Sequence, residues 1–191
     1  DGSTNVFGGG DQVRAVGAKA GNGVVPSEHG AIVRRVPYSW DGLRSFSVVT
    51  AEAATKRKVP EARFEPFTPL IDFHGPPGTV PYLSFADVYF GGFDPAKVKD
   101  KIVVVGATAP TLQDLQTTST SGSGKMPGPE LQAEAISTIL QGFPLSNPAR
   151  WLRWVLLIVF LLVPPLLGMR RLPGWVPGIG GRRMPPLLGF G

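Results

Sequence analysis

The run KIVVVG at residues 101–106 decides the expected fold. It is a continuous β-branched segment without polar alternation, which is typical of a strand buried on both faces of a sheet that helices cover. An amphipathic pattern follows at residues 129–141, where Pro129 suits a first helical turn and Gly142 a C-terminal cap. Strands that alternate with helices in this way predict an α/β fold with a mixed or parallel sheet and flanking helices.

Shorter patterns predict further elements before this strand. The strands are expected at residues 31–36 and 70–73, and the helices at residues 46–58 and 84–90. The last of these begins with a capping-box pattern, in which Asp87 follows Ser84 by three residues. The polar residues 111–125 are expected to form a loop. Residues 1–28, rich in glycine and small polar residues, are expected to form a flexible N-terminal segment.

The composition excludes several classes of site. The 191 residues include no cysteine, which rules out disulfides, thiolate zinc sites, iron–sulfur clusters and a cysteine nucleophile. Only two histidines are present, His29 and His74, so a site with several histidine ligands is not expected. We therefore expect no cofactor, no metal ion and no catalytic residue.

The net charge of +5 comes entirely from the end of the chain. Residues 1–150 hold equal numbers of basic and acidic side chains, whereas the last 41 residues hold five arginines and no acid. A basic, acid-free tail beside an apolar run is a membrane pattern more than a nucleic-acid pattern. Nucleic acid is therefore not an expected partner, and the membrane is.

The apolar run itself predicts a transmembrane helix at residues 151–169. From Val155 to Val163 it has no charge and no polar side chain, so a core helix would need covering on every side. Trp151 and Trp154 suit an interfacial position. Four arginines beyond the run, against two before it, predict a cytoplasmic location for the basic Gly/Pro-rich tail at residues 170–191 and an external location for residues 1–150.

Four side chains are candidates for a ligand site, without any motif that requires one. Asp72 and His74 are two residues apart and would share one face of a strand. Thr108 and Asp114 follow the expected strand at residues 101–106, at the edge where an open α/β sheet forms its crevice. We expect the four to approach one pocket. The alternative is that Asp114 caps a turn and His74 is exposed.

Several motifs, taken in order, resemble one known family. Together with the membrane segment that follows them, they are similar to the C-terminal part of the CHASE2 extracytoplasmic sensor domain of bacterial membrane receptors. The similar stretches cover residues 29–145 and lie at 29–37, 70–76, 80–88, 99–109, Asp114 and 126–133. The sequence departs from the pattern at Gln132 and Glu134, where similar sequences often have His and Asn, and at Thr118, where proline is frequent.

The resemblance implies a sensor rather than an enzyme. Residues 29–148 would be a partial extracytoplasmic domain that binds a small-molecule or environmental ligand. Such a domain signals through its membrane helix to a cytoplasmic output domain, a cyclase or a kinase, which does not follow here. The expected partners are therefore a ligand and the membrane. A homodimer is a further possible assembly. The alternative function is a membrane-anchored α/β enzyme with a site near Asp72, His74 and Asp114.

Overall fold

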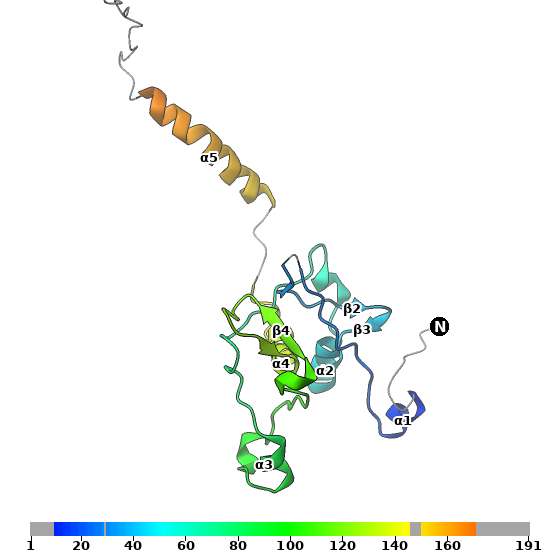
Figure 1. The fold of residues 1–191 in the computed structure, drawn as a ribbon. Coiled ribbons are helices and arrows are strands. Elements are labelled where there is room, and N and C mark those ends of the chain that lie inside the picture. Colours follow the sequence, from blue (N-terminus) through cyan, green and yellow to red (C-terminus); the bar gives the residue numbers. More distant parts are fainter. Residues whose placement is uncertain (1–9, 29, 146–149, 171–191) are drawn as a thin grey trace, which may run out of the picture. The chain divides into compact units, whose positions relative to one another are not determined.

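The structure is a computed structural model, and it describes residues 10–28, 30–145 and 150–170. The chain divides into two compact units, Asp1–Ser146 and Asn147–Gly191. The first unit contains helices, strands and short 3₁₀ helices (η) in mixed order (Figure 1). In chain order they are α1 (Gly10–Ala15), β1 (Ile32–Val33), β2 (Ser39–Trp40), β3 (Leu43–Arg44), α2 (Phe46–Thr55), η1 (Glu61–Phe64), α3 (Phe85–Tyr89), η2 (Pro95–Lys97), η3 (Pro110–Leu112), β4 (Leu115–Thr118), β5 (Met126–Pro127) and α4 (Gly128–Leu140).

The sheet of this unit is small and mixed. Its strand order is β1-β4-β5, with β1 parallel and β5 antiparallel to the central β4. A separate two-stranded hairpin joins β2 to β3 through Asp41 and Gly42, both with positive φ, as a two-residue turn of this kind requires. A mixed sheet with flanking helices confirms the predicted α/β class.

The core forms where α2 and α4 pack against each other and against the sheet. On α4 the residues Leu131, Ala135 and Ile139 follow each other at intervals of four, so they share one face. The helix predictions are confirmed, because α2, α3 and α4 lie within the ranges 46–58, 84–90 and 129–141 or within one residue of them. The other members of the core are Val33, Val36, Val48, Ala51, Phe64, Ile71 and Met126.

The prediction of a buried strand at residues 101–106 is wrong. Within the part of the chain that the structure describes, no strand pairs with this segment, and 84% of Val105 is exposed. A β-branched run favours strand geometry, but it forms a strand only where a second backbone offers hydrogen bonds. The central place in the sheet is taken instead by β4, which lies inside the predicted polar loop at residues 111–125.

The predicted strand at residues 70–73 is also absent, and the one at residues 31–36 is reduced to β1. A single antiparallel bridge joins Leu70 to Arg35, and the Ile71 N–H donates to the Arg34 carbonyl at 2.8 Å. Beyond Ile71, residues 72–74 belong to no strand, and residues 75–78 form bends and a turn. Of the predicted flexible segment at residues 1–28, residues 1–9 lie outside the described residues, and residues 10–28 contribute α1 and a bridge between Asn22 and Ser45.

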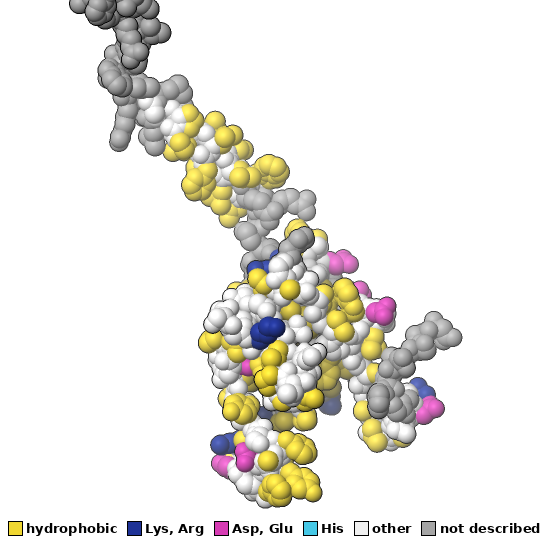
Figure 2. Space-filling view, viewed as in Figure 1, with side chains coloured by type: hydrophobic (Ala, Val, Ile, Leu, Met, Phe, Trp, Pro, Cys, Tyr) yellow, Lys and Arg dark blue, Asp and Glu magenta, His cyan; other side chains and the backbone are white. Residues whose placement is uncertain are grey.

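The second unit is described by its one helix, α5 (Arg150–Arg170), which contains Pro164 and Pro165. Large apolar side chains from Trp154 to Val163 are exposed along it, and Figure 2 shows hydrophobic patches along the visible face of this helix. No helix among the described residues is both long and apolar enough to cross a membrane. The transmembrane helix predicted at residues 151–169 is therefore not confirmed.

Matched valine truncations would test the correction at residues 101–106. Val33→Ala should lower the free energy of unfolding by about 2 kcal/mol, because Val33 is fully buried in the core. Val105→Ala should change it by less than about 0.5 kcal/mol, as at exposed positions generally. Chemical denaturation of the full chain measures both. Equal losses for the two variants would mean that residues 101–106 are buried after all.

Candidate functional site

One face of α4 carries three side chains that accept hydrogen bonds from another segment. Glu130, Glu134 and Thr138 are four residues apart and therefore lie one above another along the helix. We call these three residues the α4 acceptor row. They accept backbone N–H groups of residues 72–80: Thr138 Oγ1 from Asp72 at 3.0 Å, Glu134 Oε1 from His74 at 3.3 Å, and Glu130 Oε1 from Gly78 at 2.8 Å and Val80 at 3.2 Å.

The acceptor row explains how residues 72–80 are held without being a strand, although they contain a turn in which the Thr79 N–H donates to the Pro76 carbonyl at 3.2 Å. A backbone N–H group needs an acceptor, and here α4 side chains supply what a neighbouring strand supplies in a sheet. The strand pattern of residues 70–73 therefore does not reveal that the hydrogen-bond partner of Asp72 is a helix side chain. The segment is bound to a helix, with Ile71 in the core at its start.

The centre of the row is an imidazole–carboxylate pair. His74 Nδ1 lies 2.5 Å from Glu134 Oε2, and Glu134 is only 1% exposed, whereas about half of the His74 side chain is exposed. The hydrogen bond to Glu134 and its negative charge raise the pKa of His74 above the ordinary value, with a smaller contribution from Asp72. The other ring nitrogen, Nε2, lies 3.3 Å from the side-chain nitrogen of Gln141.

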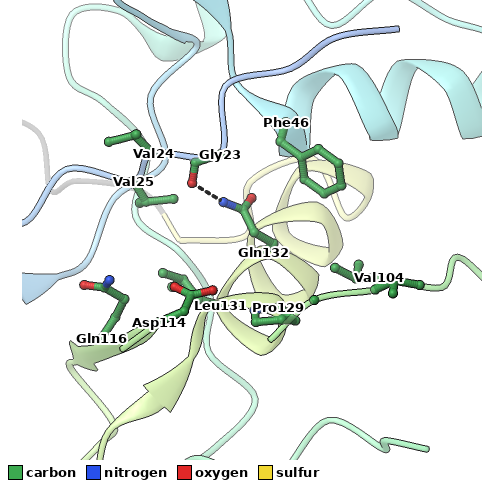
Figure 3. Close-up of a pocket in the computed structure, with 13 residues that line it drawn as sticks. Gly23, Val24, Val25, Phe46, Val104, Asp114, Gln116, Pro129, Leu131 and Gln132 are labelled. Carbon is green, nitrogen blue, oxygen red and sulfur yellow. Dashed lines mark hydrogen bonds between the residues drawn. The ribbon is translucent and has the colours of Figure 1, made fainter. Parts of the chain in front are cut away.

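A pocket of about 380 Å³ opens beside the first turn of α4 (Figure 3). Its wall is partly fixed by Gln132, whose amide donates to the Gly23 carbonyl at 2.8 Å. Asp114 is the one titratable side chain among the described residues that line it. The remaining lining is mostly apolar and comes from well-separated segments: Val24, Val25, Phe46, Val104, Val105, Gly106, Gln116, Gly128, Pro129 and Leu131.

Two glycines allow other segments to approach the first turn of α4 closely. A Cβ atom on Gly128 would clash with the Asp114 carboxylate, and one on Gly106 would clash with Pro129 Cγ. The Gly128 N–H also donates to the Asp114 carbonyl at 2.9 Å. The Asp114 carboxylate therefore lies against the start of α4, where negative charge is favoured.

The four predicted site residues have different surroundings. Asp72 and His74 are held by the α4 acceptor row, whereas Asp114 lines the pocket at the start of the same helix. Thr108 is exposed in the segment that precedes η3. Among the four, the described lining of this pocket includes only Asp114, so a pocket shared by all of them stays a prediction.

Sequence reasoning missed the acceptor row. The amphipathic pattern of residues 129–141 identifies the apolar face through Leu131, Ala135 and Ile139, but it carries no information on what Glu134 contacts. A signal was present: Glu134 is next to Ala135 and three residues after Leu131, at the border of the apolar face. A carboxylate there must find hydrogen-bond donors when the helix packs.

Comparison with known proteins identifies one family. The family model that describes the CHASE2 domain matches residues 4–167. The match extends on both sides of the similar stretches at residues 29–145, and it includes α4, its acceptor row and most of α5. No curated protein and no solved structure matches the chain significantly.

A matched pair of threonine variants tests the acceptor row. Thr138→Val keeps the shape of a fully buried side chain but leaves the Asp72 N–H without an acceptor, so we expect a loss of about 1–3 kcal/mol in the free energy of unfolding. Thr55→Val is the control, because the exposed Thr55 makes the same 2.8 Å bond to a carbonyl four residues earlier as Thr138 does. Similar losses in both variants would contradict a specific role of Thr138.

Proposed function

We propose that the chain is the ligand-sensing domain of a bacterial membrane receptor, because it belongs to the CHASE2 family. CHASE2 domains are extracytoplasmic sensory parts of such receptors. The observation that carries the proposal is the family match over residues 4–167. The proposed function is sensory because the matching family is a sensory one.

The pocket at the start of α4 is the proposed ligand site. Its lining combines apolar side chains with the Asp114 carboxylate, which is hydrogen-bonded by no side chain among the described residues. An acidic group in a mostly apolar concavity favours a small molecule with an apolar body and a cationic or hydrogen-bond-donating end. The side chains of Gln116 and Gln132 supply further polar contacts at the rim.

The pocket also suggests how binding would become a signal. A ligand shifts an equilibrium only if it binds two conformations unequally. Residues 104–106 line the pocket but belong to no strand, whereas α4 is fixed in the core. A ligand held between them would favour the conformation in which residues 104–106 lie against α4. In the receptor that we propose, the signal passes from α4 to α5 and through α5 to a cytoplasmic output domain, a cyclase or a kinase.

The membrane attachment is proposed to lie in α5. Its support is the charge-free run from Trp154 to Val163, whose described side chains are exposed and apolar, and the arginines that follow the helix without any acidic residue. Exposed apolar surface of this extent favours contact with lipid. The arginine excess then favours an external sensor domain and a cytoplasmic C-terminal end.

Reporter fusions in a bacterial host test this topology. An enzyme that is active only in the cytoplasm should be active when fused after Arg171 and inactive when fused after Asn147. A reporter active only outside the cytoplasm serves as the control and should give the opposite result. Activity of the cytoplasmic reporter at both positions would show that α5 does not cross the membrane.

A charge-matched set of probes tests the ligand site. Benzylammonium should bind the full chain saturably, and phenylacetate, which carries the opposite charge, should not. Asp114→Asn should weaken the binding of benzylammonium at least about tenfold, because a charge-assisted hydrogen bond is lost. Asp87→Asn, an exposed carboxylate of α3, is the control and should leave binding unchanged. Protein-observed NMR measures the affinities, and equal affinities in wild type and Asp114→Asn would contradict the assignment.

A further inference from the structure

At one position of the α4 acceptor row, a titratable side chain of the bound segment is itself a hydrogen-bond partner of the row. Glu130 and Thr138 accept backbone N–H groups only, and these do not titrate near neutral pH. Glu134 accepts both the His74 backbone N–H and its ring Nδ1–H. The same carboxylate therefore fixes the backbone of residue 74 and senses the charge of its side chain.

We propose that the His74–Glu134 pair is a proton-operated clamp, which holds residues 72–74 on α4 firmly when the imidazole is protonated and more weakly when it is neutral. The ligand of the clamp is a proton. It can reach the His74 ring from solvent because about half of that side chain is exposed, whereas the Glu134 carboxylate is buried. The proposal goes beyond the ligand pocket and does not depend on it, because the clamp lies on the acceptor row and not in the pocket lining.

The strength of the clamp follows from burial. Glu134 is 1% exposed, so its negative charge has lost most of its solvation and depends on its donors. Neutral His74 still donates an Nδ1–H to it, but protonated His74 adds a full positive charge at 2.5 Å. Protonation thus strengthens a bond that exists in both states, and no rearrangement of the backbone is required.

The charged groups that act on His74 give the direction of the response. In the described part of the chain these are Glu134 on α4 and Asp72 on its own segment, whereas Thr138 and Gln141 are uncharged. Both carboxylates raise the pKa of His74 above its usual value of about 6.5. The added stabilisation is therefore complete below pH 6.5, the unfolded value, and is lost as the pH rises through the raised pKa of the folded state.

Gln141 contacts the second ring nitrogen of His74, Nε2. Its side-chain nitrogen lies 3.3 Å from His74 Nε2 and 2.9 Å from Ser137 Oγ, which suits a neutral imidazole whose Nε2 accepts. A protonated imidazole donates from Nε2 instead, so the amide must present its oxygen. The orientation of the Gln141 amide thus follows the protonation state of His74.

NMR titration of the full chain in detergent micelles measures the clamp directly. The chain has two histidines, so His29→Asn assigns the His74 imidazole resonance. We expect a His74 pKa above 6.5 in the wild type and a shift of that pKa toward 6.5 in Glu134→Gln. Glu130→Gln removes a carboxylate one turn away that binds backbone only, and it should leave the pKa unchanged. A wild-type pKa at or below 6.5 would overturn the proposal without any variant.

Hydrogen exchange of the segment supplies the functional readout. Protection of the His74 amide, corrected for intrinsic exchange, should fall as the pH rises through the His74 pKa. Protection of the Gly78 amide, which Glu130 holds, should not follow that titration. In His74→Asn the pH dependence at residue 74 should disappear. If both amides change together in the wild type, or if the dependence persists in His74→Asn, the pair does not operate as a clamp.

Discussion

The buried carboxylate of Glu134 constrains the whole sensory unit. A carboxylate that is 1% exposed must be given hydrogen-bond donors, and both of its oxygens are bonded by His74. This requirement fixes residue 74 against the middle of α4, while Ile71 enters the core just before it. The path of residues 72–80 along α4 follows from these two anchors together with Glu130.

Helix α4 makes three kinds of contact, each through a different part of its surface. Its apolar face packs on α2 and the sheet, its acceptor row binds residues 72–80, and its first turn forms a wall of the pocket. The glycine at position 128 belongs to this arrangement, because a side chain there would occupy the space of the Asp114 carboxylate. Because α4 contacts other segments on several sides, a change in its position also moves the segments bound to it.

The sequence predicts the helices well and the strands poorly, for a physical reason. The pattern and caps of residues 129–141, with Pro129 and Gly142, are local properties that one helix satisfies by itself. A strand needs a partner elsewhere in the chain, and the β-branched run at residues 101–106 has none among the described residues. The short polar strand β4 is central instead, because β1 and β5 meet it on either side. For the same reason Asp72 and His74 could be selected as candidates, whereas the pattern did not pair His74 with Glu134, 60 residues away, or Asp72 with Thr138.

The pocket and the proton-operated clamp act on the same helix, and thermodynamic linkage therefore governs their relation. If a ligand beside Asp114 binds more tightly when residues 72–74 are held on α4, then protonation of His74 raises ligand affinity and the bound ligand raises the pKa of His74 by the same free energy. If the two are independent, neither quantity changes. A sensory domain with the first property responds to the product of two signals, because each occupant stabilises the state that the other prefers. Helix α4 is what would carry such coupling, because it forms a wall of the pocket, bears the partner of His74 and packs in the core through its apolar face.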